Sequence, residues 1–197
     1  MSSVTDSPDP LATLADWIAE AQAHNLLDPT AMALATTSVD GWPAVRFVLC
    51  RGVDPRGVRF FTNYESRKGR DLDATGRAAA AFHWATLERQ VRVEGRVVRS
   101  TAEESDAYFQ ARPRDSQIAS AVSPQSRPIA SLQELQARCD ELSARVGSGA
   151  VERPSWWGGY WILADAVELW RGGPHRLHDR IRYERAETGW RGTRLGP

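Results

Sequence analysis

Residues 31–50 read AMALATTSVDGWPAVRFVLC, and their pattern indicates the fold class of the chain. The first part of this stretch is small, apolar or β-branched, which suits a strand, and the Asp40-Gly41 pair after it is a hairpin signal. Beyond the turn, apolar side chains take every second position from Val45 to Leu49, and alternate side chains of a strand point to the same face. The stretch therefore predicts two antiparallel strands joined by a tight turn.

Most of the remaining chain continues this strand-rich pattern. A second turn is expected at residues 54–57, and further strands at residues 58–63, 78–84, 87–99, 158–164, 166–170, 177–184 and 190–195. Because most connections between them are short, the strands are expected to form an antiparallel sheet or barrel. The predicted fold is mainly β with helices packed around it, in the α+β class.

Capping signals place the helices. Asp9 and Pro10 supply an N-cap and a first-turn proline for a helix that ends before residue 28. Other helices are expected at about 67–75, from the overlapping capping boxes at 100–104 to about 111, and from Ser131 to Gly147. The expected buried faces of the first and last helices are Leu11, Leu14, Ala15, Ile18 and Gln22, and Leu132, Leu135, Cys139, Leu142 and Val146.

Length and composition suit a single domain with a full-sized core. The chain has 197 residues, 42% of them hydrophobic, and we expect one domain over residues 9–197 after a disordered segment of residues 1–8. The first ten residues contain no apolar leader, and no apolar run approaches the roughly 20 residues that cross a bilayer. The expectation is a soluble, cytoplasmic protein without a membrane partner.

Charge and cysteine content narrow the function classes. Lys plus Arg and Asp plus Glu both total 25, so the formal net charge is zero. Because nucleic-acid-binding proteins usually carry a basic surplus, this balance argues against nucleic acid as the main partner. Cys50 and Cys139 fall in a predicted strand and a predicted helix, which argues against a disulfide framework and against a metal site.

A first anion site is predicted at Ser66-Arg67-Lys68, where a strand ends and a helix opens. Cations oppose the dipole at a helix N-terminus. A phosphate bound between the backbone N–H groups and the two cationic side chains makes the arrangement favourable, and Ser66 adds a further donor. The alternative is a solvated helix start, but the pattern favours a phosphate site.

A second anion site is predicted at Tyr108, Arg112 and Ser116, at a corner where Pro113 breaks a helix. A tyrosine hydroxyl, an arginine fork and a serine suit an oxyanion. Asp115 or Ser116 is expected to cap the next helix, and in the alternative interpretation Asp115 only pairs with a neighbouring arginine. Two anion sites imply two phosphorylated ligands, because the Gly-x-Gly-x-x-Gly motif of a dinucleotide site does not follow any strand.

A cationic row is predicted near the C-terminus, where Arg176, His178, Arg180 and Arg182 alternate with other residues after a Gly-Pro turn. In one strand these side chains share a face at a spacing of roughly 7 Å, and they repel one another unless water or an anion covers them. The row is either a solvated edge strand or part of an anion site.

These motifs, in this order, resemble the pyridoxamine 5′-phosphate oxidase family from about residue 11 to residue 197. The segments that carry the resemblance are Arg46-Phe47-Val48-Leu49-Cys50-Arg51, Phe61-Thr62-Asn63, Ser66-Arg67-Lys68, Leu87-Glu88-Arg89-Gln90, Arg112-Pro113-Arg114-Asp115-Ser116-Gln117, Gln125-Ser126, residues 170–180 and Arg194-Leu195-Gly196-Pro197. The resemblance implies an antiparallel, FMN-binding split β-barrel and a homodimer whose two FMN sites are built from both subunits.

The resemblance also implies roles, residue by residue. The implied FMN-binding residues are Arg46, Val48, Leu49, Arg51, Phe61, Thr62, Arg67, Lys68, Gln90, Gln125, Ser126, Trp170 and Arg180. The implied substrate-binding residues are Arg51, Tyr108, Arg112, Ser116, Arg176 and His178. Arg176 and His178 are the implied catalytic pair. The Arg176 guanidinium stays protonated, so it is expected to orient substrate and stabilise charge, whereas His178 is expected to accept or relay a proton. Arg182 has no implied role and is expected to face solvent.

The implied reaction is the oxidation of pyridoxamine 5′-phosphate or pyridoxine 5′-phosphate to pyridoxal 5′-phosphate. A hydride leaves the substrate C4′ for flavin N5, and dioxygen reoxidises the flavin with release of hydrogen peroxide.

Three departures from the family pattern keep other interpretations open. Arg51 stands where lysine is usual, residues 119–121 read Ala-Ser-Ala where Gly-Ala-Trp is typical, and only eight polar residues precede the first helix. A phenazine-type FMN oxidase of secondary metabolism shares the barrel and the C-terminal cluster but varies the substrate-phosphate residues. A third interpretation is a non-catalytic FMN or pyridoxal phosphate binding protein, against which Arg176 and His178 argue.

Overall fold

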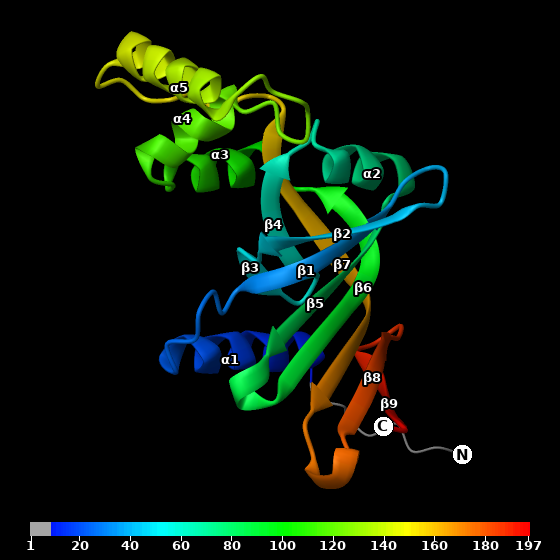
Figure 1. The fold of residues 1–197 in the computed structure, drawn as a ribbon. Helices are drawn as coiled ribbons and strands as arrows, with labels where there is room; N and C mark the ends of the chain where they lie inside the picture. The colour runs from blue at the N-terminus through cyan, green and yellow to red at the C-terminus, as the bar shows by residue number, and fades with distance from the viewer. Residues whose placement is uncertain (1–8) are drawn as a thin grey trace.

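The computed structural model describes residues 9–197, so the disorder expected for residues 1–8 falls outside the described part. The helices are α1 (Pro10–Ala23), α2 (Arg67–Thr75), α3 (Ala102–Gln110), α4 (Arg114–Val122) and α5 (Leu132–Val146) (Figure 1). The strands are β1 (Ala31–Thr37), β2 (Pro43–Leu49), β3 (Gly52–Asp54), β4 (Gly57–Asn63), β5 (Arg77–Trp84), β6 (Arg89–Arg99), β7 (Trp157–Arg171), β8 (Asp179–Arg185) and β9 (Trp190–Leu195). Two short 3₁₀ turns cover Ala85–Leu87 and Pro174–Arg176.

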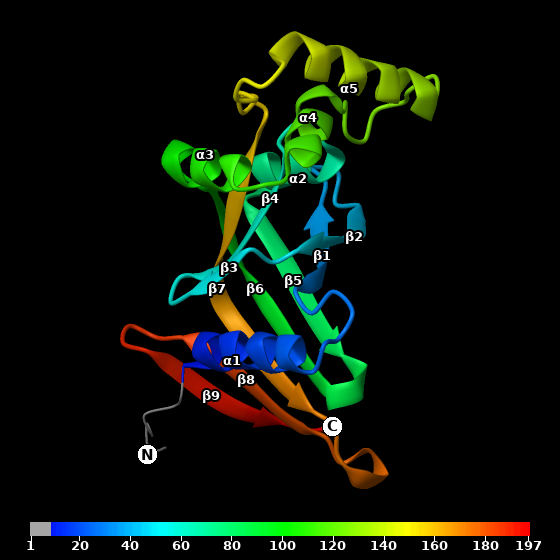
Figure 2. The same ribbon diagram turned by 90° about the vertical axis from the view of Figure 1, so that its left-hand side faces the viewer.

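The strands form one curled antiparallel sheet. Their order is β2-β1-β5-β6-β7-β4-β3, and β8 and β9 continue the sheet from β7. Helices α2 to α5 gather at one end of the sheet, whereas α1 lies toward the other end, near β8 and β9 (Figures 1 and 2). The predicted mainly β, α+β fold with an antiparallel split barrel is confirmed. The hairpin of residues 31–50 is confirmed as well, because β1 and β2 pair from Ala31↔Leu49 to Thr37↔Pro43.

Strand β7 is the axis of the sheet. It pairs with β6 along its length, and with β4 and β8 in turn on its other side. The separate strands expected at residues 158–164 and 166–170 are one continuous strand. The interruption at Asp165 is a β-bulge, since Gly95 pairs with Ala164 while Glu94 pairs with Ala166. A Cβ on Gly95 would lie 1.8 Å from the Leu163 carbonyl oxygen, so only glycine fits at this bulge.

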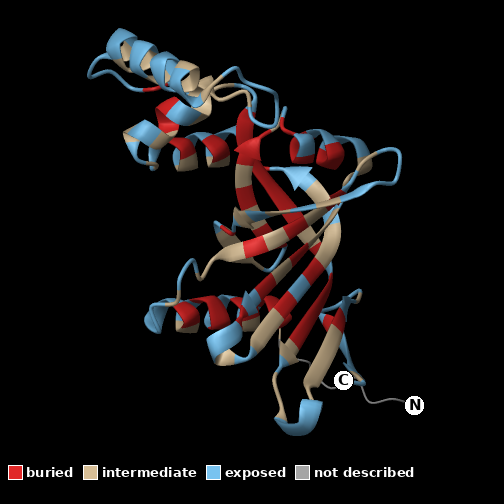
Figure 3. Cartoon of the chain, in the orientation of Figure 1, coloured by how far each residue is buried: buried red, intermediate tan, exposed pale blue. Residues whose placement is uncertain are grey.

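The hydrophobic core lies along the inner faces of the central strands and under the helices (Figure 3). A main cluster joins α1 to the sheet and contains Leu14, Phe60 and Phe82. A second, smaller cluster lies beneath α3, α4 and α5 and consists of Phe109, Ile118, Val151 and Trp157. The second cluster therefore provides the apolar contacts that hold these helices together at one end of the sheet.

Helix α1 buries a slightly different face from the expected one. Leu11, Leu14 and Ile18 are buried as predicted, but Trp17 and Ala21 complete the face. The predicted members Ala15 and Gln22 are exposed. Residues 14, 17, 18 and 21 lie on one side of a helix with 3.6 residues per turn, and the large indole turns that side toward the sheet.

Helices α4 and α5 also depart from expectation. Helix α4 begins at Arg114 with Pro113 at its N-cap, so neither Asp115 nor Ser116 caps it. Helix α5 has its predicted caps, Ser131 and Gly147, but none of its residues is fully buried. Leu132 is 73% exposed, and only Cys139, Leu142 and Val146 pack against the second cluster. The reason is that α5 lies at the outer edge of the molecule (Figure 1).

The C-terminal cationic row is interrupted. Strand β8 begins at Asp179, and the residues before it form a 3₁₀ turn in which His175 and Arg176 have φ angles of 55° and 63°. Arg176 and His178 therefore do not share a strand face with Arg180 and Arg182, because the Gly-Pro turn extends further along the chain than the alternation suggests.

Two negative findings apply to residues 9–197. No helix there is both long enough and apolar enough to cross a membrane. No group of three or more His, Cys, Asp or Glu side chains there is arranged to hold a metal ion.

Candidate functional site

A cavity of about 910 Å³ opens at the helical end of the sheet, between β2, β4, α2 and the α3–α4 corner. The cavity brings together most of the residues that the sequence singled out. The predicted residues that line it are Arg46, Val48, Leu49, Arg51, Phe61, Thr62, Arg67, Lys68, Tyr108, Arg112, Ser116, Gln125 and Ser126.

The N-terminus of α2 forms one wall of the cavity. The Ser66 hydroxyl caps the helix and accepts a hydrogen bond of 3.2 Å from the Gly69 amide. The Lys68 side chain is only 9% exposed, and its Nζ donates to Gln125 Oε1 (2.8 Å), to Thr62 Oγ1 (3.1 Å) and to Ser66 Oγ (3.3 Å). All three acceptors are neutral. Burial, with a contribution from nearby Arg46, therefore lowers the pKa of Lys68 to about 8.

Arg46 joins this wall from β2. Its Nη1 donates to the Leu34 and Ala44 carbonyls and to the Thr36 hydroxyl. Burial lowers the pKa of Arg46, and the positive charge of Arg67 lowers it further, whereas Asp71 opposes both effects. Arg46, Arg67 and Lys68 thus form one cluster of cations, which we call the α2 cluster. Its electrostatic repulsion falls when an anion binds.

A second group of cations lies at the α3–α4 corner. Arg112 donates from Nη1 to Ser120 Oγ at 2.8 Å, and its guanidinium lies 4.8 Å from the centre of the Trp157 ring. Burial lowers the pKa of Arg112, and nearby Arg51 lowers it further. Beside them the Tyr108 ring stacks on Phe61, with 3.9 Å between the ring centres. Arg51 and Arg112 make up the corner cluster.

The ion-pair alternative for this corner is wrong. Among residues 9–197, no salt bridge joins Asp115 to Arg112 or to Arg114. Arg114 instead donates to the Gly147 and Gly149 carbonyls, at the end of α5. Arg112 therefore remains directed toward the cavity.

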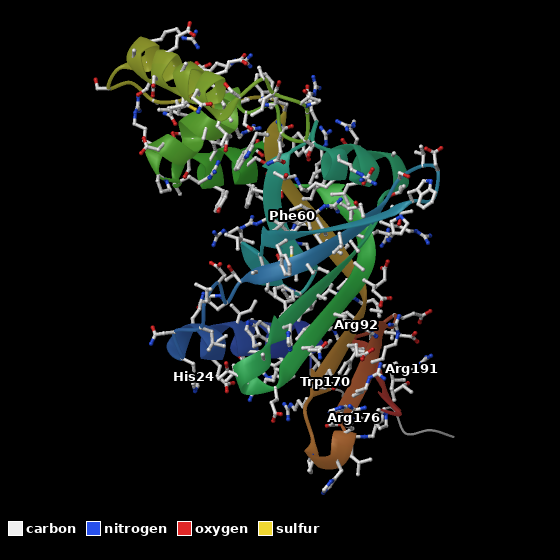
Figure 4. The ribbon with its side chains drawn as sticks, viewed as in Figure 1. His24, Phe60, Arg92, Trp170, Arg176 and Arg191 are labelled. Atoms are coloured by element: carbon white, nitrogen blue, oxygen red, sulfur yellow. The ribbon has the colours of Figure 1, made fainter. Side chains whose placement is uncertain are left out.

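The remaining predicted residues lie elsewhere in the chain. Gln90, Trp170 and Arg180 line a smaller hollow of about 180 Å³ together with Arg92 and Glu168. Trp170 and Arg176 lie at the end of the molecule near β8, away from α2 (Figure 4). The predicted site residues thus fall in two separate parts of the chain, the large cavity on one side and the small hollow with the C-terminal segment on the other.

Glu168 organises the small hollow. Its carboxylate is 4% exposed and accepts hydrogen bonds from Arg180 Nε, at 2.9 Å, and from Arg92. Such a buried carboxylate between two guanidinium groups restricts both of them. Arg180 is additionally held by the Gly196 carbonyl at 2.9 Å, so its position depends on the C-terminal residues.

His178 packs on Trp170, with 4.6 Å between the ring centres, and its Nδ1 lies 3.3 Å from the Gly173 amide nitrogen. Since that amide donates, Nδ1 acts as the acceptor, and the neutral ring carries its proton on Nε2.

Arg176 and Ser126 are non-glycine residues with positive φ, at 63° and 68°. Such backbone conformations cost energy and cluster at functional sites.

The prediction that Arg182 faces solvent is wrong, because its side chain is paired with Glu94. Its guanidinium makes a two-pronged contact with Glu94, from Nη1 at 3.2 Å and from Nη2 at 3.0 Å. The reason is that β8 pairs with β7, which places Arg182 across the sheet from β6, where Glu94 lies. Such a cross-strand pairing depends on the fold and is not visible in the local pattern.

Sequence reasoning missed Ser120 and Trp157, which also line the cavity. Helical spacing could have found Ser120, because it follows Ser116 by four residues and so lies on the same side of α4. Trp157 begins β7 and reaches the cavity only through the packing of β7 against β4, for which the sequence carries no local signal.

Comparisons with known proteins fit this geometry. A family model described as pyridoxamine 5′-phosphate oxidase matches residues 18–145. A second one, described as the pyridoxine 5′-phosphate oxidase C-terminal dimerisation region, matches residues 157–197. Pyridoxine/pyridoxamine 5′-phosphate oxidases from Burkholderia multivorans and Cupriavidus taiwanensis are 51% and 49% identical to the chain, and each alignment covers 97% of the chain and 90% of the relative.

Solved structures show the same fold. PhzG from Burkholderia lata 383, in complex with tetrahydrophenazine-1-carboxylic acid, has a TM-score of 0.91 and 34% identity, over 97% of this chain and 94% of that one. A pyridoxamine 5′-phosphate oxidase-related, FMN-binding protein from Nostoc punctiforme has a TM-score of 0.75 at 17% identity, over 94% and 96% of the two chains. With both family models matching and relatives near 50% identity along almost its whole length, the chain belongs to the pyridoxamine 5′-phosphate oxidase family of oxidoreductases.

Proposed function

We propose that the protein is an FMN-dependent oxidase that converts pyridoxamine 5′-phosphate or pyridoxine 5′-phosphate to pyridoxal 5′-phosphate, with dioxygen as the electron acceptor. The observation that carries the proposal is the pair of cation clusters in one cavity, the α2 cluster and the corner cluster. Two phosphate groups, one on the cofactor and one on the substrate, would each neutralise one cluster.

The residues of the cavity fit FMN. The α2 cluster offers three cations and a helix N-terminus to the cofactor phosphate, and the volume of about 910 Å³ is in the range of small-molecule sites. Around it, Val48, Leu49, Thr62 and the Gln125-Ser126 pair would hold the remainder of the cofactor. The chemistry that FMN supplies when bound is two-electron oxidation, after which dioxygen accepts the electrons and leaves as hydrogen peroxide.

Tyr108, Arg112 and Ser116 would hold the substrate phosphate at the corner cluster. Arg51 lies between the two roles, because it lines the cavity and its charge acts on Arg112. Holding the substrate by its phosphate fixes its ring relative to the cofactor, and such positioning lowers the entropy cost of the reaction.

A second protomer would complete the site. Gln90, Trp170, Arg176, His178 and Arg180 lie outside the cavity, and the last four lie in the segment that matches the dimerisation region. A two-fold interface uses the same patch of both protomers, so a residue i of one protomer that contacts residue j of its partner is matched by residue j of the first contacting residue i of the second. Such a dimer would place the C-terminal part of each protomer over the cavity of the other, which gives two sites.

In that dimer, Arg176 and His178 would face the substrate. Arg176 stays cationic and would stabilise charge as the substrate loses a hydride. His178 is expected from the sequence to accept or relay a proton, but its Nδ1 accepts from the Gly173 amide, so the neutral ring would instead donate a hydrogen bond from Nε2. The cytoplasmic location and the single domain over residues 9–197 stay predictions.

The second candidate function is oxidation of a phenazine-type secondary metabolite. The resemblance to PhzG, at a TM-score of 0.91, and the presence of Arg51 favour it. Such a substrate has no need of a phosphate pocket, whereas Tyr108, Arg112 and Ser116 all line the cavity here. The higher identity of about 50% to pyridoxine/pyridoxamine 5′-phosphate oxidases also favours the first function over the second, and an oxidase over a binding protein.

One experiment separates these functions. The purified protein is examined for flavin absorbance, then mixed under air with pyridoxine 5′-phosphate, pyridoxamine 5′-phosphate or unphosphorylated pyridoxine while hydrogen peroxide is followed. We expect bound flavin, and peroxide release that is much faster with the two phosphorylated substrates than with unphosphorylated pyridoxine. Protein that neither carries nor takes up flavin would overturn the proposal altogether. Flavin without turnover of either phosphate would favour the metabolite oxidase or the binding protein.

A further inference from the structure

A buried threonine links the α2 cluster to a buried carboxylate. Thr36 of β1 is 2% exposed and Asp71 of α2 is 7% exposed. The Thr36 hydroxyl donates to Asp71 Oδ2 at 2.8 Å and accepts from Arg46 Nη1 at 2.7 Å. A hydroxyl has a single proton, so the carboxylate fixes which way it points, and its lone pairs are left for the guanidinium.

The Arg46 guanidinium is anchored through one nitrogen. Each hydrogen bond that Arg46 makes within residues 9–197 leaves from Nη1, to the Thr36 hydroxyl and to the carbonyls of Leu34 and Ala44. The donors on Nε and Nη2 are left for a ligand in the cavity that Arg46 lines. Anchoring at one side of a planar guanidinium sets the direction of its other donors.

Asp71 also lies on the helix that presents the other two cations. It follows Arg67 by four residues and Lys68 by three, within the same nine-residue helix. The Asp71–Thr36–Arg46 chain therefore connects α2, β1 and β2, the three elements on which the α2 cluster depends. The carboxylate of Asp71 favours the charged form of Arg46.

We propose that Thr36 and Asp71 are positioning residues, which direct the free donors of Arg46 toward the phosphate of a bound ligand. They act through Arg46 and do not line the cavity. The identification of that ligand as FMN rests on the proposed function, whereas the link itself requires only a phosphate group.

The test measures the binding of FMN to the full chain from which bound flavin has first been removed. Quenching of the flavin fluorescence reports the binding. Thr36→Val keeps the side-chain shape and removes the hydroxyl, and we expect the Kd for FMN to rise about tenfold. Thr36→Ser restores the hydroxyl and should stay within about twofold of the parent protein. Thr37→Val is the matched control, because Thr37 is an exposed threonine next to it in the same strand, and it should change nothing. Riboflavin, which has no phosphate, should bind all variants alike.

A double-mutant cycle shows whether the effect passes through Arg46. In an Arg46→Ala background, Thr36→Val should weaken FMN binding no further. An equal further loss in that background would overturn the proposal, as would a Thr36→Ser variant that binds as poorly as Thr36→Val. Unchanged FMN affinity in a folded Thr36→Val variant would overturn it too.

Asp71→Asn supplies an independent variant if Thr36→Val does not fold. Simple removal of a negative charge beside an anion site should tighten FMN binding. If Asp71 positions Arg46 through Thr36, Asp71→Asn should instead weaken FMN binding. Tighter FMN binding by this variant would contradict the proposal. Inorganic phosphate, measured by calorimetry, separates the two levels of the argument. If the parent protein does not bind FMN but binds inorganic phosphate, and Thr36→Val weakens that phosphate binding, the proposed function is refuted and the positioning role is supported.

Discussion

Lys68 is the most unusual single residue of the site, since its ammonium is buried among neutral hydrogen-bond acceptors. A bound phosphate next to it would favour the charged form and raise its pKa from about 8. Above about pH 8 the free protein has lost the Lys68 proton, so binding of FMN is then accompanied by uptake of a proton. The Kd for FMN should be nearly constant below pH 7.5 and rise as the pH increases above about 8.

Titration of apoprotein with FMN between pH 6.5 and pH 10 checks this prediction. Lys68→Arg is the control, because arginine stays charged throughout this range and its affinity should not fall in the same window. Riboflavin should show no such pH dependence. A flat Kd for FMN across pH 8 in the parent protein would refute the assignment of Lys68 to the phosphate.

Arg112 is the residue that should distinguish phosphorylated from unphosphorylated substrates. Arg112→Ala is expected to raise the KM for pyridoxine 5′-phosphate by about 10- to 100-fold, because a charge-assisted contact is lost. The KM for unphosphorylated pyridoxine should change little. Arg114→Ala is the neighbouring control, since the hydrogen bonds of its side chain within residues 9–197 go to the Gly147 and Gly149 carbonyls near the end of α5. Steady-state peroxide assays measure all of these values, and an equal increase for both substrates would count against a phosphate role.

At the scale of elements, the ends of a helix could be predicted where capping residues next to it in the sequence determine them. Ser66 and Gly76 set the ends of α2, and the prediction of residues 67–75 agrees with the structure. The errors arose where tertiary contacts decide. The bulge at Asp165 resembles a break between two strands, and the face of α5 could not be placed without knowing that the helix lies at the edge of the molecule.

The β-bulge itself is testable. Gly95→Ala would place a Cβ 1.8 Å from the Leu163 carbonyl oxygen, and backbone on both strands would have to move. We expect a loss of about 3 kcal/mol or more in the free energy of unfolding, measured by urea denaturation. Gly196→Ala, where an added Cβ meets nothing within 4 Å, should be neutral. A Gly95→Ala variant as stable as the parent would show that the pairing of β6 with β7 is wrong here.

At the scale of the whole molecule, the sequence predicted the candidate residues but not how the fold arranges them. The cluster at residues 66–68 and the corner at residues 108–116 could be recognised from local chemistry, and the cavity unites them. The division of the site could not be derived from local patterns, because Trp170 and Arg180 are separated from the cavity by the length of the sheet. We propose that a partner subunit supplies them from the resemblance to a dimeric family and from the match to the dimerisation region.

Complementation between two inactive variants tests the shared site most directly. Arg67→Ala with Lys68→Ala disables the cavity, and Arg176→Ala disables the C-terminal part. In a mixed dimer, one site receives both damaged parts and the other receives two intact ones. Random reassortment should therefore restore about a quarter of the parent sites.

The measurement is peroxide release from pyridoxine 5′-phosphate after the two variants are unfolded and refolded together with FMN. We predict recovery to about a quarter of the parent rate. The matched control mixes the Arg67→Ala, Lys68→Ala variant with Arg112→Ala, both damaged in the cavity, and should recover nothing beyond the activity of the separate variants. Absence of recovery in the first mixture, with mixed dimers present, would contradict a site built from two protomers.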